Sequence, residues 1–213
     1  NNNCYIGSQI NTNKSRYMGK KIPNVVYQTF STTNLPKQIT DVIEGNKKRN
    51  TDYQFKFYNG EQRREFIKEN FDERTLNAYD AIDESYGAVQ ADFWRYCILY
   101  KNGGVYIDIK SYIKGRLRDL IKPRDECILD IPRKGGERWR DFTGPTYEQW
   151  VLIFAPEHPY LKEVIDLIIN YIESRWDPVV MKDNKRWNGI LTTKQKILNL
   201  TGPDAFTKAC LLY

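Results

Sequence analysis

A helix that is apolar on nearly every side runs into a pair of glycines and then into an alternating strand. This junction constrains the fold more than any other segment. Residues 88–101 make up the helical segment, in which Asp92 and Arg95 are the polar exceptions. Residues 102–104 (Asn-Gly-Gly) break the helix, and residues 105–109 then alternate as a strand. Because a helix without a polar face needs cover on all sides, we expect it to be largely buried.

Strand and helix patterns alternate along the rest of the chain. Strands are expected at 22–30, 53–58, 105–109, 127–131 and 150–154, and helices at 35–44, 60–70, 72–82, 88–101, 160–175, 194–199 and 204–211. Asn59 and Asp72 stand where they would cap the second and third helices. Such alternation predicts an α/β fold: a mixed, mostly parallel sheet flanked by helices.

The domain organisation is expected to be simple. A length of 213 residues favours one domain over residues 1–213, with a polar leader at 1–20. The chain stops within a helical pattern at Tyr213, which suggests the N-terminal part of a longer polypeptide. No apolar run approaches the roughly 20 residues that span a bilayer, so no membrane span is expected.

The amino-acid composition limits which ligands and which catalytic or metal-binding groups the chain can use. There are 33 Lys and Arg against 27 Asp and Glu, a formal charge of +6 that suits an anionic ligand such as a diphosphate or a nucleic acid. The single histidine, His158, excludes histidine zinc sites, and it reads as a loop residue before a helix. The four cysteines are far apart and match no metal-ligand spacing. Carboxylates and the backbone must therefore carry any chemistry.

Three polar side chains share one face of the strand that follows the glycines. Tyr106, Asp108 and Lys110 alternate with apolar residues that point the other way. In open α/β sheets, ligands bind beyond the carboxyl ends of the strands, and Asp108 lies at such an end. An acidic side chain there can meet a sugar hydroxyl or a metal ion, with Lys110 roughly 7 Å further along.

These segments resemble glycosyltransferase family 32, and the Lys110 variant is most similar to glycosyltransferases of large DNA viruses such as the chlorella viruses. The family pattern has a proline-led first strand ending in Gln-Thr-aromatic, an acidic-x-x-Arg-Tyr helix, Gly-Gly-x-Tyr-x-Asp-x-Asp, and a later Thr-Gly-Pro. In this chain the pattern stands, in order, at 27–30, 92–96, 103–110 and 201–203.

The resemblance implies a GT-A fold and a retaining transfer from a nucleotide-diphosphate sugar, with a divalent ion, Mn²⁺ or Mg²⁺, at the diphosphate. It implies catalytic roles for Asp92, Arg95 and Asp108, with Asp108 also the metal ligand. It also implies a nucleotide pocket that includes Gln28, Thr29, Phe30, Tyr58, Asn59, Tyr106 and Lys110.

Lys110 departs from the family pattern, which has an acid at that position. A protonated lysine cannot coordinate a cation. Either another carboxylate joins Asp108, for which the acidic cluster at 80–84 is a candidate, or the Lys110 ammonium itself balances the diphosphate. We expect the metal to be retained, because a departing nucleoside diphosphate develops charge that a divalent ion stabilises.

Other interpretations stay open. Asp92 and Arg95 have the spacing of a buried ion pair, and Asp108-x-Lys110 also fits a metal-dependent nuclease. The lost acid also fits a non-catalytic sugar-binding domain. The leading hypothesis is an enzyme that transfers a hexose or deoxyhexose from a UDP-sugar, or less favourably a GDP-sugar, to a glycan acceptor. We expect it to be a cytoplasmic monomer, in the host cytoplasm if viral, without a nucleic-acid partner.

Overall fold

The chain builds a five-stranded mixed sheet. The computed structural model describes residues 21–130, 146–174, 197 and 200–212. The strands follow the order β2-β1-β3-β5-β4 across the sheet, and their bounds are β1 Val25–Thr29, β2 Gln54–Tyr58, β3 Gly104–Ile107, β4 Cys127–Ile128 and β5 Val151–Phe154. β1 is parallel to both β2 and β3, whereas β5 is antiparallel to β3 and β4. The prediction of a mixed sheet is confirmed, but the sheet is not mostly parallel: two of its four strand pairings are parallel and two are antiparallel.

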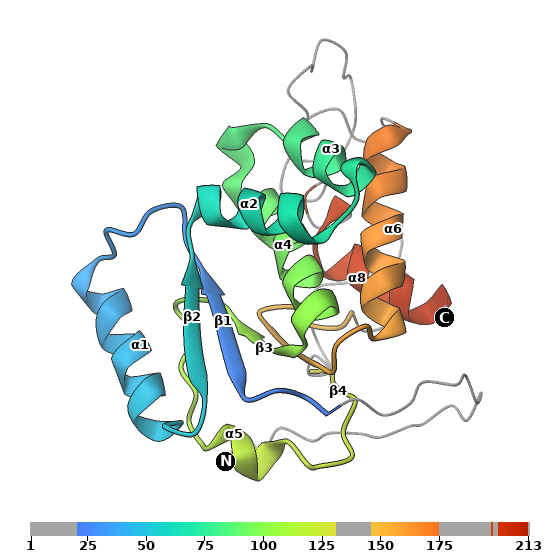
Figure 1. Ribbon diagram of the computed structural model, residues 1–213. Coiled ribbons are helices and arrows are strands. Elements are labelled where there is room, and N and C mark those ends of the chain that lie inside the picture. The colour runs from blue at the N-terminus through green and yellow to red at the C-terminus, as the bar shows by residue number, and fades with distance from the viewer. Residues whose placement is uncertain (1–20, 131–145, 175–196, 198–199, 213) are drawn as a thin grey trace.

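Helices cover both faces of this sheet (Figure 1). On one face α1 (Lys37–Arg49) and α5 (Leu117–Leu120) pack through apolar clusters that include Val26 and Ile107. On the other face a larger cluster joins Tyr27 and Tyr106 to α2 (Gly60–Asn70), α3 (Glu73–Ala81), α4 (Gly87–Asn102), α6 (Pro159–Glu173) and α8 (Pro203–Leu212), with the short 3₁₀ helix η1 (Glu84–Tyr86) leading into α4.

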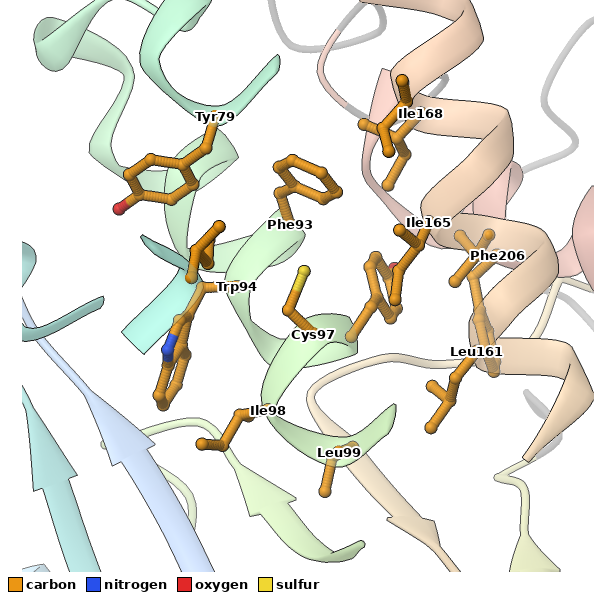
Figure 2. Packing of buried hydrophobic residues seen from close by; sticks show 14 of the residues in the cluster. Tyr79, Phe93, Trp94, Cys97, Ile98, Leu99, Leu161, Ile165, Ile168 and Phe206 are labelled. Carbon is orange, nitrogen blue, oxygen red and sulfur yellow. The ribbon is translucent and has the colours of Figure 1, made fainter. Parts of the chain in front are cut away.

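The expected buried helix is α4, and the prediction is confirmed. Every residue from Asp92 to Leu99 is buried. Figure 2 shows Phe93 and Cys97 of α4 in the same core as Leu161 and Ile165 of α6 and Phe206 of α8. The full burial of α4 means that its two charged residues are buried as well.

The glycine pair makes the sharp connection from α4 into β3. Gly103 has φ 65° and Gly104 has φ 110°, in the left-handed region that residues with a side chain rarely adopt. A Cβ on Gly103 would stand 2.6 Å from Cδ of Pro156, and one on Gly104 would stand 2.8 Å from the Val25 carbonyl oxygen. The two glycines let β3 begin directly beneath α4.

Element boundaries differ modestly from the expectations. Asn59 caps α2 in a reciprocal pair with Gln62, and Asp72 caps α3, as predicted. However, β3 ends at Ile107 rather than residue 109, because Asp108 begins a turn in which Ser111 N donates to its carbonyl at 2.8 Å. Helix α1 starts at Lys37 and runs to Arg49, five residues past the expected end. Of the expected helix at 194–199 only Ile197 is described, and the leader lies outside the described residues.

Within the described part of the chain, no helix combines the length and the apolar character that a membrane crossing requires.

Candidate active site

Asp108 lies just past β3, at the carboxyl edge of the parallel strands, and its side chain is 43% exposed. Its Oδ1 accepts a hydrogen bond of 2.9 Å from the Tyr106 hydroxyl and lies 3.5 Å from Nη2 of Arg95. Its backbone N–H donates to the Trp150 carbonyl at 2.8 Å. Its Oδ2 has no partner among the described residues, so one carboxylate oxygen is open to solvent.

The buried guanidinium of Arg95 contacts the Asp108 carboxylate on the side that faces the protein interior. Its guanidinium reaches Asp92 Oδ1 with Nη2 at 2.6 Å and donates from Nη1 to the Gln149 carbonyl at 2.8 Å. Its Cζ stands 4.4 Å from the centre of the Tyr106 ring. Burial by itself lowers the pKa of Arg95, but the charges of Asp92, Tyr106 and Asp108 outweigh it and raise the pKa. Arg95 therefore stays cationic although it is only 6% exposed.

Asp92 is the buried partner of Arg95. It is 7% exposed, and its Oδ2 accepts from the Thr201 hydroxyl at 3.1 Å. Burial raises the pKa of Asp92 to about 6, against the opposing effects of the Arg95 charge and the Thr201 hydrogen bond. The ion pair is therefore formed at neutral pH and weakens in mild acid. The interpretation of Asp92 and Arg95 as a buried ion pair is correct, and Asp108 is its extension to the surface.

Tyr96 and Gln149 complete the hydrogen-bond network around Asp92 and Arg95. The sequence motifs did not identify Gln149. The Tyr96 hydroxyl donates to Oε1 of Gln149 and also lies 2.9 Å from the Thr201 carbonyl. Thr201 and Tyr96 belong to motifs that carried the family resemblance. Gln149, by contrast, stands in no recognised pattern, and only the fold brings it to Arg95.

The ends of β1 and β2 carry a second polar group, on the α4 face of the sheet. Thr29 Oγ1 donates to the Tyr58 carbonyl at 2.7 Å and accepts from Nη1 of Arg63 at the same distance. The Tyr58 ring packs against Trp94 with 5.0 Å between ring centres. Arg63 is only 3% exposed, and its Nε also donates to the Tyr79 hydroxyl.

Gln28 and Phe30 alternate to the opposite face, toward α1. Phe30 packs beside Ile39 and Ile43 of α1. Gln28 is 3% exposed, its Nε2 has no partner among the described residues, and it lines a cavity of about 200 Å³ with Leu35, Ile43 and Phe57. The structure does not bring these two side chains together with the Asp108 group, and their nucleotide role stays a prediction.

The remaining candidates lie apart. Lys110 is exposed in the turn after Asp108, and the Asn59 side chain caps α2. In the acidic cluster at 80–84, Asp80 pairs with Arg64 at 2.6 Å, and Asp83 accepts from Ser85 N at the start of η1. Across the described ranges no three His, Cys, Asp or Glu side chains converge as a metal site. Asp108 Oδ2, which has no partner among the described residues, is a carboxylate oxygen available at this edge of the sheet.

Comparison with known proteins relates the segment that carries this site to a family. Residues 36–127, which include Asp92, Arg95 and Asp108, match the glycosyltransferase sugar-binding region containing a DXD motif. The chain is 30% identical over 145 residues to inositol phosphoceramide mannosyltransferase 3 of Schizosaccharomyces pombe, covering 68% of this chain and 36% of that protein. It is also 30% identical over 102 residues to an uncharacterized glycosyltransferase of Acanthamoeba polyphaga mimivirus, covering 47% and 40%.

The chain is a glycosyltransferase family 32-like domain. A solved glycosyltransferase, PaToxG, shares the fold with a TM-score of 0.63 at 17% identity, over 91% of this chain and 70% of that one. An initiation-specific alpha-1,6-mannosyltransferase of Candida albicans is 25% identical over 215 residues, covering 91% of this chain and 54% of that protein. The chain spans about half or less of the curated relatives it matches first. The matched residues include Lys110, which stands where the family pattern described above has its second acid.

Proposed function

We propose that this domain transfers a hexose or deoxyhexose, with retention, from a nucleotide-diphosphate sugar to a glycan acceptor, with a UDP-sugar as the favoured donor. The observation that supports it most is the half-exposed carboxylate of Asp108, held by the buried cation Arg95 at the carboxyl edge of the sheet. Several relatives are named mannosyltransferases, so mannose belongs among the first hexoses to examine.

The exposed carboxylate oxygen of Asp108 suits a divalent ion that the protein and the substrate diphosphate would hold together. Mg²⁺ and similar ions are commonly held by one or two carboxylates together with substrate phosphates rather than by an all-protein cage. Asp108 Oδ2 would supply one such oxygen, and the diphosphate and water would supply the others. The ion would offset the charge of the departing diphosphate, and the exposed ammonium of Lys110 would add to that effect.

The role of the protein is mainly positioning. His158 caps α6, and burial lowers its pKa to about 4, so it is neutral and engaged in the fold. We propose that the departing phosphate accepts the proton of the acceptor hydroxyl, which requires no protein base. Arg95 and Tyr106 hold the Asp108 carboxylate in a fixed orientation for this step. Direct contact of Asp92 and Arg95 with the donor stays a prediction, since both lie behind Asp108 in this structure.

Calorimetric titration with UDP, GDP and their hexose conjugates, in Mn²⁺, tests the proposal. We expect binding of at least one nucleotide, and slow donor hydrolysis that falls about 10³-fold in Asp108→Asn. Asp41→Asn, on the exposed face of α1, is the control and should keep wild-type hydrolysis. If neither UDP nor GDP binds the folded protein, the proposal is wrong. Binding without hydrolysis would instead identify a non-catalytic sugar-binding domain.

The nuclease alternative gains no support from the geometry. A metal-dependent nuclease needs a second acid beside Asp108, and both oxygens of Asp92 are already bonded, to Arg95 and to Thr201. A monomeric state and a cytoplasmic location stay predictions.

A further inference from the structure

Trp150 stands opposite Asp108 on the neighbouring chain segment, one pair beyond the β3–β5 ladder. The β3–β5 register pairs Tyr106 with Leu152 and Ile107 with Val151. The hydrogen bond from Asp108 N to the Trp150 carbonyl, 2.8 Å long, continues that ladder by one pair. Opposed residues of an antiparallel pair project to the same face, with Cβ atoms roughly 5 Å apart. The register therefore places the indole on the face of Asp108.

The alternation of the neighbouring pairs agrees with this placement. Tyr106 and Leu152 both belong to the core cluster beneath α4, whereas Ile107 and Val151 both pack on the opposite face. The next pair, Asp108 and Trp150, returns to the α4 face, on which Arg95 and Asp92 also lie.

Trp150 is exposed where an indole would ordinarily be covered. Its residue is 40% exposed, while Trp94 is completely buried. Within the described part of the chain the Trp150 indole makes no ring contact and no hydrogen bond. Tyr112, another exposed aromatic close to Asp108, differs because the Arg49 guanidinium stands 4.3 Å from the centre of its ring. An open indole on the same face as the Asp108 carboxylate offers a large, rigid apolar ring on which a ligand can pack.

The strand order separates this surface from the positions that are predicted to bind the nucleotide. β1 and β2, whose ends carry Thr29 and Tyr58, lie on one side of β3, and β5 lies on the other. A donor that extends from the β1 and β2 ends to Asp108 leaves Trp150 free on the far side. The free indole is therefore available to the second substrate.

We infer that Trp150 is an acceptor subsite, on which a pyranose ring stacks with its hydroxyls directed at Asp108. The axial C–H groups of a pyranose form an apolar face that matches an indole, and its hydroxyls remain at the rim for polar partners. Stacking on Trp150 would bring an acceptor hydroxyl to the side of the Asp108 carboxylate. This inference rests on the proposed function.

Saturation-transfer NMR with methyl glucoside, methyl galactoside and methyl mannoside, in UDP and Mn²⁺, tests the subsite. We expect ring C–H signals from at least one probe with the wild type, at least fivefold weaker signals in Trp150→Ala, and partial recovery in Trp150→Phe. Tyr112→Ala is the matched control, because it removes an exposed aromatic four residues from Asp108 on the α1 side, and it should keep the signals. The absence of any wild-type signal, or equal signals in Trp150→Ala, overturns the inference.

Calorimetry with UDP on the same variants keeps this inference separate from the proposed function. Unchanged nucleotide binding in folded Trp150→Ala, together with the lost sugar signal, supports an acceptor subsite. Loss of nucleotide binding in that variant would place Trp150 in the donor site and overturn the inference. Failure of the wild type to bind any nucleotide would instead contradict the proposed function, whatever the sugar probes show.

Discussion

The two faces of the sheet hold the end of β3 by different means. On the α4 face the charged Arg95 bonds Asp92 and contacts Asp108. On the α1 face two fully buried neutral amides, Asn46 and Asn50, hold the chain that follows. Asn46 bonds the Ser111 carbonyl at 2.9 Å and the Ile113 N–H at 2.8 Å, and Asn50 accepts from Leu117 N at 2.7 Å.

The charged contacts belong to the candidate active site, whereas the neutral amide contacts only hold the backbone in place. The charged contacts orient a carboxylate that reaches solvent, and they depend on the ionisation of Asp92. The amide contacts bond only backbone groups and carry no charge, so they are independent of pH. Four variants, in order of decreasing effect, would break or sharpen this comparison.

Arg95→Met should have the largest effect. It leaves Asp92 buried without its cation, and removing one partner of a buried pair costs about 3–5 kcal/mol. Urea denaturation at pH 7.5 measures the loss. Arg64→Met, which breaks the exposed pair with Asp80, is the control and should cost no more than about 1 kcal/mol. Equal losses in the two variants would contradict the assignment of Arg95 as the buried hub.

Asn46→Ala should come second, at about 2–3 kcal/mol, because it leaves the Ser111 carbonyl and the Ile113 N–H without partners in a part-buried site. Denaturation at pH 5 and at pH 7.5 should give the same loss. A loss that changes with pH would show that the α1 contacts are not the neutral scaffold described above.

The third-largest effect should be a pH dependence of the free energy of unfolding, which we expect from the α4 face and not from the α1 face. Folding raises the pKa of Asp92 from 3.8 to about 6, so the native state binds the proton more tightly. That stabilisation is complete below pH 4 and disappears as the pH rises through about 6. Wild type should therefore lose about 1–3 kcal/mol relative to Asp92→Asn between pH 4 and pH 7. A flat difference between the two proteins would show that burial does not perturb Asp92.

Lys37→Ala should have the smallest effect. Its pair with Asp41, 2.7 Å long, has side chains that are 85% and 61% exposed. Exposed helix pairs contribute about 0.3–0.5 kcal/mol, and salt screens them. Thermal melts in low and high salt measure the change. A loss above about 1 kcal/mol would mean that the α1 surface charges contribute as much as buried contacts do.

Local signals accounted for most of the fold. Helix caps at Asn59 and Asp72, the apolar surround of α4 and the glycine break at 103–104 are properties of short segments, and each was predictable. The ends of strands were less predictable. Strand β3 stops at Ile107 because the chain turns at Asp108, and no residue type there requires a turn.

The candidate site was only partly predictable for a different reason. Motifs identified Asp92, Arg95, Tyr106 and Asp108, which the fold brings together. Gln149 lies 54 residues from Arg95 in sequence and Thr201 lies 109 residues from Asp92, and such contacts have no local signature. The burial of Arg63 and the turn of Gln28 toward α1 were not evident either, because both depend on packing between distant elements.

The sequence by itself determined which groups are available: a helix with two charges in an apolar surround, two glycines able to adopt positive φ, and a lysine in place of the second acid at position 110. The tertiary structure alone decided how those groups act. It made Asp92 and Arg95 a buried pair and left Asp108 as their solvent-facing extension, with Trp150 across from it. The physical reason is that desolvation and pairing depend on neighbours that are distant along the chain, whereas helix breaks and caps depend on adjacent residues.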